Sequence, residues 1–215
     1  MIKIHGVILS PFVRKVLAVV NIKKLPYENI AAFPGTKTPA FLSISPLGKI
    51  PALEDGELGI SDSTAICEYL DDKYPEIATR PSSAEDRAKA RWFEEYGDTK
   101  LTEICVAGIY YERFVKKALG KGEADETIVA NNIEKLLPPQ QDYLESVLPT
   151  DGFLFADIST ADISIVGPFI SASYVGYTPD KEQLPKLVAY IDRVKSHEAV
   201  AEMLKAEAEL LNKIA

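Results

Sequence analysis

The most informative stretch of the first part of the chain is residues 45–66, SPLGKIPALEDGELGISDSTAI. Ile50-Pro51 lies where a loop enters a short apolar run, and a cis peptide bond is inexpensive essentially only before proline. A cis bond there would turn the Ile50 main chain outward as a free edge. Asp55-Gly56 indicates a hairpin turn, and Asp62 precedes apolar positions with helical spacing. The stretch therefore predicts a loop, a hairpin and the start of a helix.

The residues before this stretch alternate between strand and helix patterns. The predicted elements are a strand over 2–5, a helix over 11–20, a strand over 27–31 and a short helix over 39–43. A strand, a helix and a second strand in this order form a βαβ unit with parallel strands. With the hairpin and a helix over 62–74, the order is βαβαββα.

The rest of the chain is predicted to be helical. Residues 75–83 contain two prolines and a run of small and polar side chains, which is typical of a linker. Ser83, followed by Asp86, opens a long helix with a variant of the capping box. Further helices are predicted over 126–148, interrupted at Pro138-Pro139, and over 163–174, 184–195 and 198–213. We therefore expect an α/β domain over 1–76, a linker over 77–83 and an all-α domain over 84–215.

Composition limits the possible functions. A hydrophobic content of 47% suffices for a packed core, and no apolar run approaches the length of about 20 residues that spans a bilayer. The N-terminus enters a strand pattern without a signal-peptide organisation, so we expect a cytoplasmic protein with no membrane partner. A net charge of −8 argues against a nucleic-acid partner. Cys67 and Cys105 lack the spacing of a metal site, which predicts buried thiols and no metal.

Ser10-Pro11 begins the first helix, and its ordinary explanation is a standard helix start. The same position places a hydroxyl at the positive end of a helix, where it can donate to an anion. A thiolate is such an anion, and free thiols have a pKa of about 8.5, so a hydrogen bond and a helix terminus would favour ionisation at neutral pH. The two roles are compatible. Arg14 and Lys15 would either cover the polar face of this helix or meet the second domain.

Asp62 and Ser63 also have two explanations. Both residue types cap helices, but here they also offer amides and a hydroxyl to a carboxylate and an acid to an ammonium group. An amino-acid head group carries both charges. Lys37 and Lys49 belong to a type that is usually solvated on the surface. Lys49 directly precedes Ile50-Pro51 and is the better candidate for binding a second carboxylate.

Several aromatic side chains could line an apolar pocket. Aromatic residues at helical spacing are usually part of the core, and this is the favoured interpretation for Phe114. The candidates are Phe12, Phe33, Tyr110, Tyr111 and Phe114.

Four segments stand out along nearly the whole chain, SPFVRKV at 10–16, PAFLSISPLGKIPAL at 39–53, SDSTAICEYL at 61–70 and STADISI at 159–165. In this order, they resemble the cytosolic glutathione transferase family. The resemblance implies a thioredoxin-like N-terminal domain with a mixed four-stranded sheet and an all-α C-terminal domain. The serine followed by proline at 10–11 is similar to the serine-type sequences of the plant phi and tau classes and of bacteria.

The resemblance also implies glutathione as the cosubstrate. Ser10 would hydrogen-bond the glutathione sulfur and favour the thiolate. Ile50, preceding a cis Pro51, would pair its main chain with the cysteinyl part. The remaining contacts would be Asp62 and Ser63 to the γ-glutamyl group, and Lys37 and Lys49 to the glycine carboxylate.

The activity implied by the resemblance is conjugation of the glutathione thiolate to hydrophobic electrophiles, in detoxification, by a homodimer. One alternative is a non-catalytic binding or assembly module, which would be expected to lose Ser10 or Asp62-Ser63. Another is a glutathione-dependent peroxidase, isomerase or disulfide reductase, although serine at position 10 argues against the reductase branch. Thr36 stands where related classes often have histidine, and Leu47 where many have an aromatic dimer contact.

Overall fold

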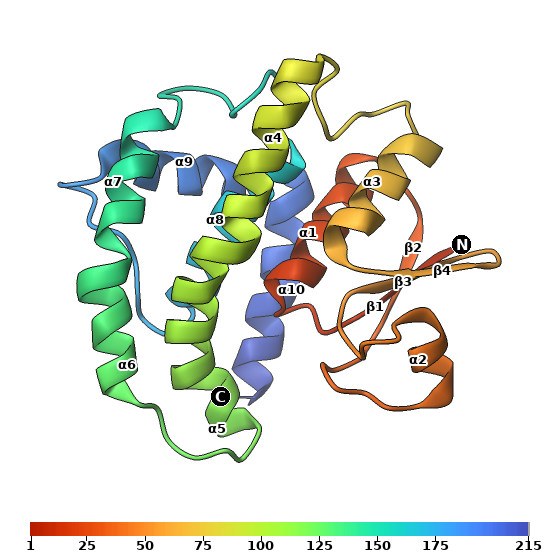
Figure 1. Cartoon of the computed structure of the whole chain (residues 1–215), viewed down its shortest axis with the longest axis horizontal. Helices are drawn as coiled ribbons and strands as arrows, with labels where there is room; N and C mark the ends of the chain where they lie inside the picture. Colours follow the sequence, from red (N-terminus) through yellow and green to blue (C-terminus); the bar gives the residue numbers. More distant parts are fainter. Residues whose placement is uncertain (215) are drawn as a thin grey trace. The chain divides into compact units, whose positions relative to one another are not determined.

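The computed structural model describes residues 1–214, which form two compact units (Figure 1). Unit 1 contains residues 1–81 together with the C-terminal segment 196–214, and unit 2 contains residues 82–195. This grouping differs in one respect from the division expected from the sequence, because the C-terminal segment joins the N-terminal unit. The linker and the domain limits expected from the sequence otherwise stay predictions.

Unit 1 has the predicted βαβαββα order followed by one additional helix. Its elements are β1 (Ile2–His5), α1 (Pro11–Ile22), β2 (Tyr27–Ile30), α2 (Pro39–Ile44), β3 (Ala52–Asp55), β4 (Leu58–Ser61), α3 (Ser63–Lys73) and α10 (Glu198–Ile214). The sheet order is β2-β1-β3-β4, with β1 parallel to β2 and antiparallel to β3. The mixed four-stranded sheet is therefore confirmed. The predicted hairpin joins β3 to β4 and turns at Gly56, whose φ of +64° favours glycine.

The helices of unit 1 cover both faces of the sheet. In Figure 1, α1 and α3 lie on one side of the sheet and α2 lies on the other. Every residue of α1 from 13 to 20 is buried, because α3 and α10 both pack against this helix. The buried stripe of α10 contains Val200, Met203 and Glu207, which have helical spacing. The burial of α1 on all sides thus explains why α10 belongs to unit 1.

Unit 2 is helical, as predicted. Its elements, in which η denotes a π-helix, are α4 (Ala84–Tyr96), η1 (Gly97–Val115), α5 (Lys116–Ala118), α6 (Glu126–Asn131), η2 (Asn132–Leu136), α7 (Pro138–Val147), α8 (Thr160–Ser173) and α9 (Pro185–Ser196). The segments α4, η1 and α5 follow one another directly and correspond to the predicted long helix. The predicted interruption occurs where α7 begins at Pro138. The two prolines therefore start a new helix and do not merely bend an existing one.

Helix α8 forms the centre of unit 2, and residues 160–172 are all buried. It packs against α4 and η1, and a Cβ atom on Gly97 would lie 2.3 Å from the Ser164 carbonyl oxygen. Only glycine therefore permits this close approach. The predicted cap of α8 is present, since the buried Asp162 carboxylate accepts hydrogen bonds from the Ser159 amide at 2.8 Å and the Leu154 amide at 2.8 Å.

The two cysteines are free and buried, as predicted. Burial raises the pKa of the Cys105 thiol to about 12, so this thiol is not a nucleophile at neutral pH. Among the helices that the structure describes, none is long and apolar enough to cross a membrane.

Candidate active site

Several of the predicted site segments meet at one end of the sheet in unit 1. His5 of β1 pairs with Ala52 of β3, and Ala52 pairs with Ser61 of β4. The residues that follow β1 and β4 therefore lie at the same end as the residues that precede β3. This register brings together the loop that leads to Ser10, the Ile50-Pro51 bond and the Asp62-Ser63 pair.

The Ile50-Pro51 peptide bond is cis, as predicted. Among residues 1–214, the N–H and C=O groups of Ile50 take part in no backbone hydrogen bond. The loop before this bond is held by Ser45, whose hydroxyl donates to the Lys49 carbonyl oxygen at 2.7 Å. The Ile50 main chain thus offers one donor and one acceptor to an extended ligand.

Asp62 is the N-cap of α3, and its Oδ1 atom accepts from the Thr64 and Ala65 amides at 3.0 and 3.1 Å. Its φ of +88° is uncommon for a residue other than glycine, and such conformations often occur at functional sites. Within the described chain, the second oxygen of Asp62 and the Ser63 hydroxyl have no hydrogen-bond partner. Capping therefore uses only part of the hydrogen-bonding capacity of the pair.

Ser10 is the N-cap of α1 in an extended conformation, with φ −76° and ψ 128°. Its main chain is well held, since its N–H donates to the Val7 carbonyl oxygen at 3.0 Å and its own carbonyl accepts from the Arg14 N–H at 2.9 Å. Its side chain makes no capping hydrogen bond in the part of the chain that the structure describes. The half-buried hydroxyl and the first amides of α1 are therefore available to an anion.

Arg14 and Lys15 do not cover a polar helix face, because each is about 1% exposed. Arg14 forms a two-point ion pair with Glu207 of α10, a residue that the sequence placed in the helical domain. The Lys15 ammonium donates to the Thr64 hydroxyl of α3 at 3.0 Å. The two cations thus join the first turns of α1 to α10 and to the start of α3.

Glu207 is a residue that sequence analysis missed. Two features of the sequence could have indicated that Glu207 is buried against α1. One is the position of this acid on the apolar stripe of α10, and the other is the apolar run VLAVV at 16–20, which requires burial of α1 on every side. Neither signal identifies the partner, because 193 positions separate Arg14 from Glu207.

Lys37 and Lys49 are exposed, and their loops are adjacent. The Gly35 amide donates to the Gly48 carbonyl oxygen at 2.8 Å, and both glycines have positive φ angles, of +85° and +64°. Over the described residues, neither lysine makes an ion pair or a side-chain hydrogen bond. The two ammonium groups are therefore able to bind a carboxylate, since no ion pair or side-chain hydrogen bond within residues 1–214 occupies them.

The aromatic candidates belong to both units. In unit 1, Phe12 is half-buried on α1 and Phe33 is 62% exposed in the loop after β2. That these rings line a pocket together with residues of η1 stays a prediction.

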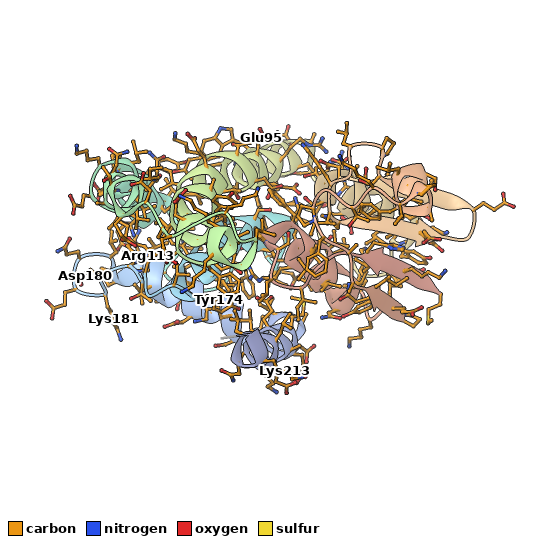
Figure 2. The ribbon with its side chains drawn as sticks, turned by 90° about the horizontal axis from the view of Figure 1, so that it is seen from below. Glu95, Arg113, Tyr174, Asp180, Lys181 and Lys213 are labelled. Atoms are coloured by element: carbon orange, nitrogen blue, oxygen red, sulfur yellow. The ribbon has the colours of Figure 1, made fainter. Side chains whose placement is uncertain are left out.

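In unit 2, Tyr110 is buried, and its ring stacks on Phe114 with the centroids 5.3 Å apart. Tyr111 is half-buried on the same segment. Tyr174 contacts Tyr110 edge-on, and Arg113, labelled with Tyr174 in Figure 2, donates to the main chain just beyond α8. Tyr110 is thus part of the core of unit 2.

His5 has one carboxylate partner, since its Nε2 atom lies 2.5 Å from Glu54 Oε1. Sequence analysis did not identify this cross-strand pair. Across the residues described, there is no group of three or more histidine, cysteine, aspartate or glutamate side chains that could hold a metal ion.

Comparison with known proteins identifies the family. The model of the glutathione S-transferase N-terminal domain matches residues 4–79, and the model of the C-terminal domain matches residues 108–207. Glutathione S-transferase 3 of Zea mays is 31% identical over 170 residues, which cover 74% of this chain and 75% of that protein. A glutathione S-transferase from Rhodospirillum rubrum F11 superimposes with a TM-score of 0.86 at 26% identity, covering 95% of this chain and 92% of that one.

A second solved structure, glutathione S-transferase-I bound with lactoylglutathione, has a TM-score of 0.81 at 25% identity and covers 94% of this chain and 97% of that one. The two family models together extend over both parts of the chain, and they match the order of the four segments noted in the sequence. The chain therefore belongs to the glutathione S-transferase family.

Proposed function

We propose that this protein binds reduced glutathione and transfers its thiolate to hydrophobic electrophiles, with Ser10 as the group that donates to the sulfur. The observation that carries the proposal is the state of the Ser10 hydroxyl, which begins a helix without making a capping hydrogen bond among residues 1–214. The family uses glutathione as a substrate, which supports the identity of the thiol.

The other site residues are assigned to successive parts of an extended glutathione molecule. The donor and acceptor of Ile50 can pair with the cysteinyl main chain, as in the addition of a strand to a sheet edge. The free oxygen of Asp62 suits the γ-glutamyl ammonium group, and the Ser63 hydroxyl suits the carboxylate beside it. At the other end, Lys37 and Lys49 suit the glycine carboxylate.

The chemical step requires an ionised sulfur. Once the thiol proton has left to solvent, the thiolate attacks an electrophilic carbon, a C–S bond forms and the leaving group departs with its electron pair. A hydroxyl donor and the α1 terminus would together lower the thiol pKa by about one or two units, at about 1.4 kcal/mol for each unit. Phe12, Phe33, Tyr111 and Phe114 remain the candidates for contact with the electrophile.

The experiment compares wild type, Ser10→Ala and Ser63→Ala in two assays, retention on immobilised glutathione and conjugation of a chromogenic aryl halide. We expect Ser10→Ala to retain binding and lose turnover, whereas Ser63→Ala should lose binding. Ser83→Ala is a matched control, because Ser83 is also an N-cap serine but lies at the start of α4 in unit 2. Equal activity in all four proteins would remove both assignments.

Hydroperoxide and disulfide substrates, assayed in parallel, test the other glutathione-dependent reactions. Turnover of a hydroperoxide or a disulfide at a higher kcat/KM than any electrophile would replace conjugation as the main activity.

We also propose a homodimer, as is typical of the family. Leu47 of unit 1 is 78% exposed, and a second subunit could cover this apolar side chain. Sedimentation equilibrium measures the mass directly. A monomer mass at micromolar concentration would contradict this proposal.

A further inference from the structure

The first turn of α1 is held differently from the first turns of four other helices in this chain. In α2, α3, α4 and α6, the N-cap side chain accepts a hydrogen bond from a helix amide. These caps are Thr38, Asp62, Ser83 and Asp125. The side chain of Ser10 does not do this in the described structure. Without a capping hydrogen bond, another contact must restrain the first turn of α1 if the Ser10 hydroxyl is to keep a fixed position.

The ion pair between Arg14 and Glu207 restrains the first turn of α1. The Arg14 Nε and Nη2 atoms donate to the two carboxylate oxygens of Glu207 at 2.7 and 2.6 Å. Each side chain is about 1% exposed. A two-point contact of this kind restrains both the distance and the orientation of the two helices.

The pair acts directly on the turn that presents Ser10. The Arg14 amide donates to the Ser10 carbonyl oxygen at 2.9 Å, so the two residues are the two ends of the first helical turn of α1. A displacement of Arg14 would therefore move the Ser10 main chain and the direction of its hydroxyl.

We propose that Arg14 and Glu207 are positioning residues for Ser10, through which the C-terminal helix holds the first turn of α1 while the Ser10 hydroxyl remains free to donate to the thiol. This inference rests on the proposed function of Ser10. It assigns a role in the reaction to α10, whose residues do not reach the sulfur in this scheme.

The test uses the full chain with both members of the pair replaced by apolar residues, Arg14→Met with Glu207→Leu. Well-packed apolar replacements of a buried pair are often neutral or stabilising, so this variant is expected to remain folded. Glu207→Gln, which keeps the shape of the side chain, provides a second variant. Arg14→Lys keeps the charge but loses the two-point contact, and it should give an intermediate result.

Asp71→Asn provides the matched control at the other end of the same helix. Lys23, the C-cap of α1, lies 2.6 Å from Asp71, and both side chains are nearly buried. This variant also disrupts a buried ion pair of α1, but it does so far from Ser10 along the helix.

The measurements are the thermal midpoint, the dissociation constant of S-methylglutathione and the apparent pKa of bound glutathione from its thiolate absorbance. In the two variants that break the pair, we expect a rise of about half a unit or more in the apparent pKa, which is about a three-fold loss of thiolate on the acid limb. Binding of S-methylglutathione should stay within about two-fold of wild type. Asp71→Asn should lower the thermal midpoint and leave the apparent pKa unchanged.

An unchanged apparent pKa in folded pair variants would overturn the inference, as would an equal rise in Asp71→Asn. Failure of the proposed function is distinguishable from either result, because Ser10→Ala would then leave the apparent pKa at its wild-type value. A rise in Ser10→Ala combined with no change in the pair variants removes only the positioning role.

Discussion

The starts of α1 and α4 have the same type of N-cap residue, yet the two serines are used differently. The Ser83 hydroxyl accepts from the Asp86 amide at 3.0 Å, and Glu85 and Asp86 place negative charge in the first turn of α4. The first turn of α1 has no acidic residue, and the Ser10 hydroxyl makes no capping bond within the described chain. The positive end of α4 is therefore satisfied internally, whereas that of α1 remains open to an external anion.

A serine before a helix therefore does not by itself reveal its role. What matters is whether neighbouring groups use its hydrogen-bonding capacity. Four substitutions test this distinction, and they are given in decreasing order of the free-energy change that we expect.

At the start of α8, the Asp162 carboxylate accepts more hydrogen bonds than the Ser83 cap of α4 does. Asp162→Ala should therefore cause the largest loss of stability. The buried carboxylate accepts from the Ser159 and Leu154 amides and from the Tyr190 hydroxyl. Removing it leaves these donors buried without an acceptor, and we expect a loss of about 3 kcal/mol or more in the free energy of unfolding. Urea denaturation measures the change, and an unfolding midpoint equal to that of wild type would contradict the prediction.

Ser10→Ala should separate activity from stability. Because the hydroxyl and the α1 terminus together lower the thiol pKa by about one or two units in this proposal, loss of the hydroxyl should lower turnover below the thiol pKa by up to about 10²-fold, which is about 2.7 kcal/mol. Because the hydroxyl is not used as a cap, the free energy of unfolding should change by less than about 0.5 kcal/mol. Conjugation kinetics and urea denaturation are measured on the same preparation. A loss of about 1 kcal/mol in stability would mean that Ser10 caps α1 after all.

Ser83→Ala should show the opposite behaviour. Its hydroxyl accepts from the Asp86 amide, and loss of a serine cap typically costs about 1 kcal/mol. The free energy of unfolding should fall by about that amount, with no change in kcat/KM. A fall in kcat/KM similar to that of Ser10→Ala would show that the activity assay reports helix capping in general.

An acidic residue in the first turn of α1 should give that turn the negative charge that Glu85 and Asp86 give to the first turn of α4. Phe12→Glu introduces a charge beside Ser10, and Phe12→Gln is the neutral control with the same loss of the ring. A charge at a helix N-terminus is worth about 0.3–1 kcal/mol, so thiolate formation in the glutamate variant should fall by up to about five-fold relative to the glutamine variant. Equal apparent thiol pKa values in the two variants would exclude a contribution of the α1 terminus to thiol acidity.

The local features of this protein could be predicted from the sequence because they depend on nearby residues. Proline restricts its own backbone and the peptide bond before it, so Pro51 indicated the cis turn, and Pro138-Pro139 indicated the interruption at which α7 begins. Serine and aspartate at helix starts likewise identified the caps at Ser83 and Asp62. These signals act over a few residues, and they predicted the order βαβαββα followed by helices.

Which of these features lie together in space follows from long-range packing and not from local sequence. The strand register brings Ser10, Ile50 and Asp62 to one end of the sheet, and register depends on pairing between distant segments. The pairing of Arg14 with Glu207 and the docking of α10 on α1 likewise depend on the burial of complementary surfaces far apart in the chain. Local preference thus determines where a helix begins, whereas long-range packing determines whether the hydroxyl at its start is used or left free.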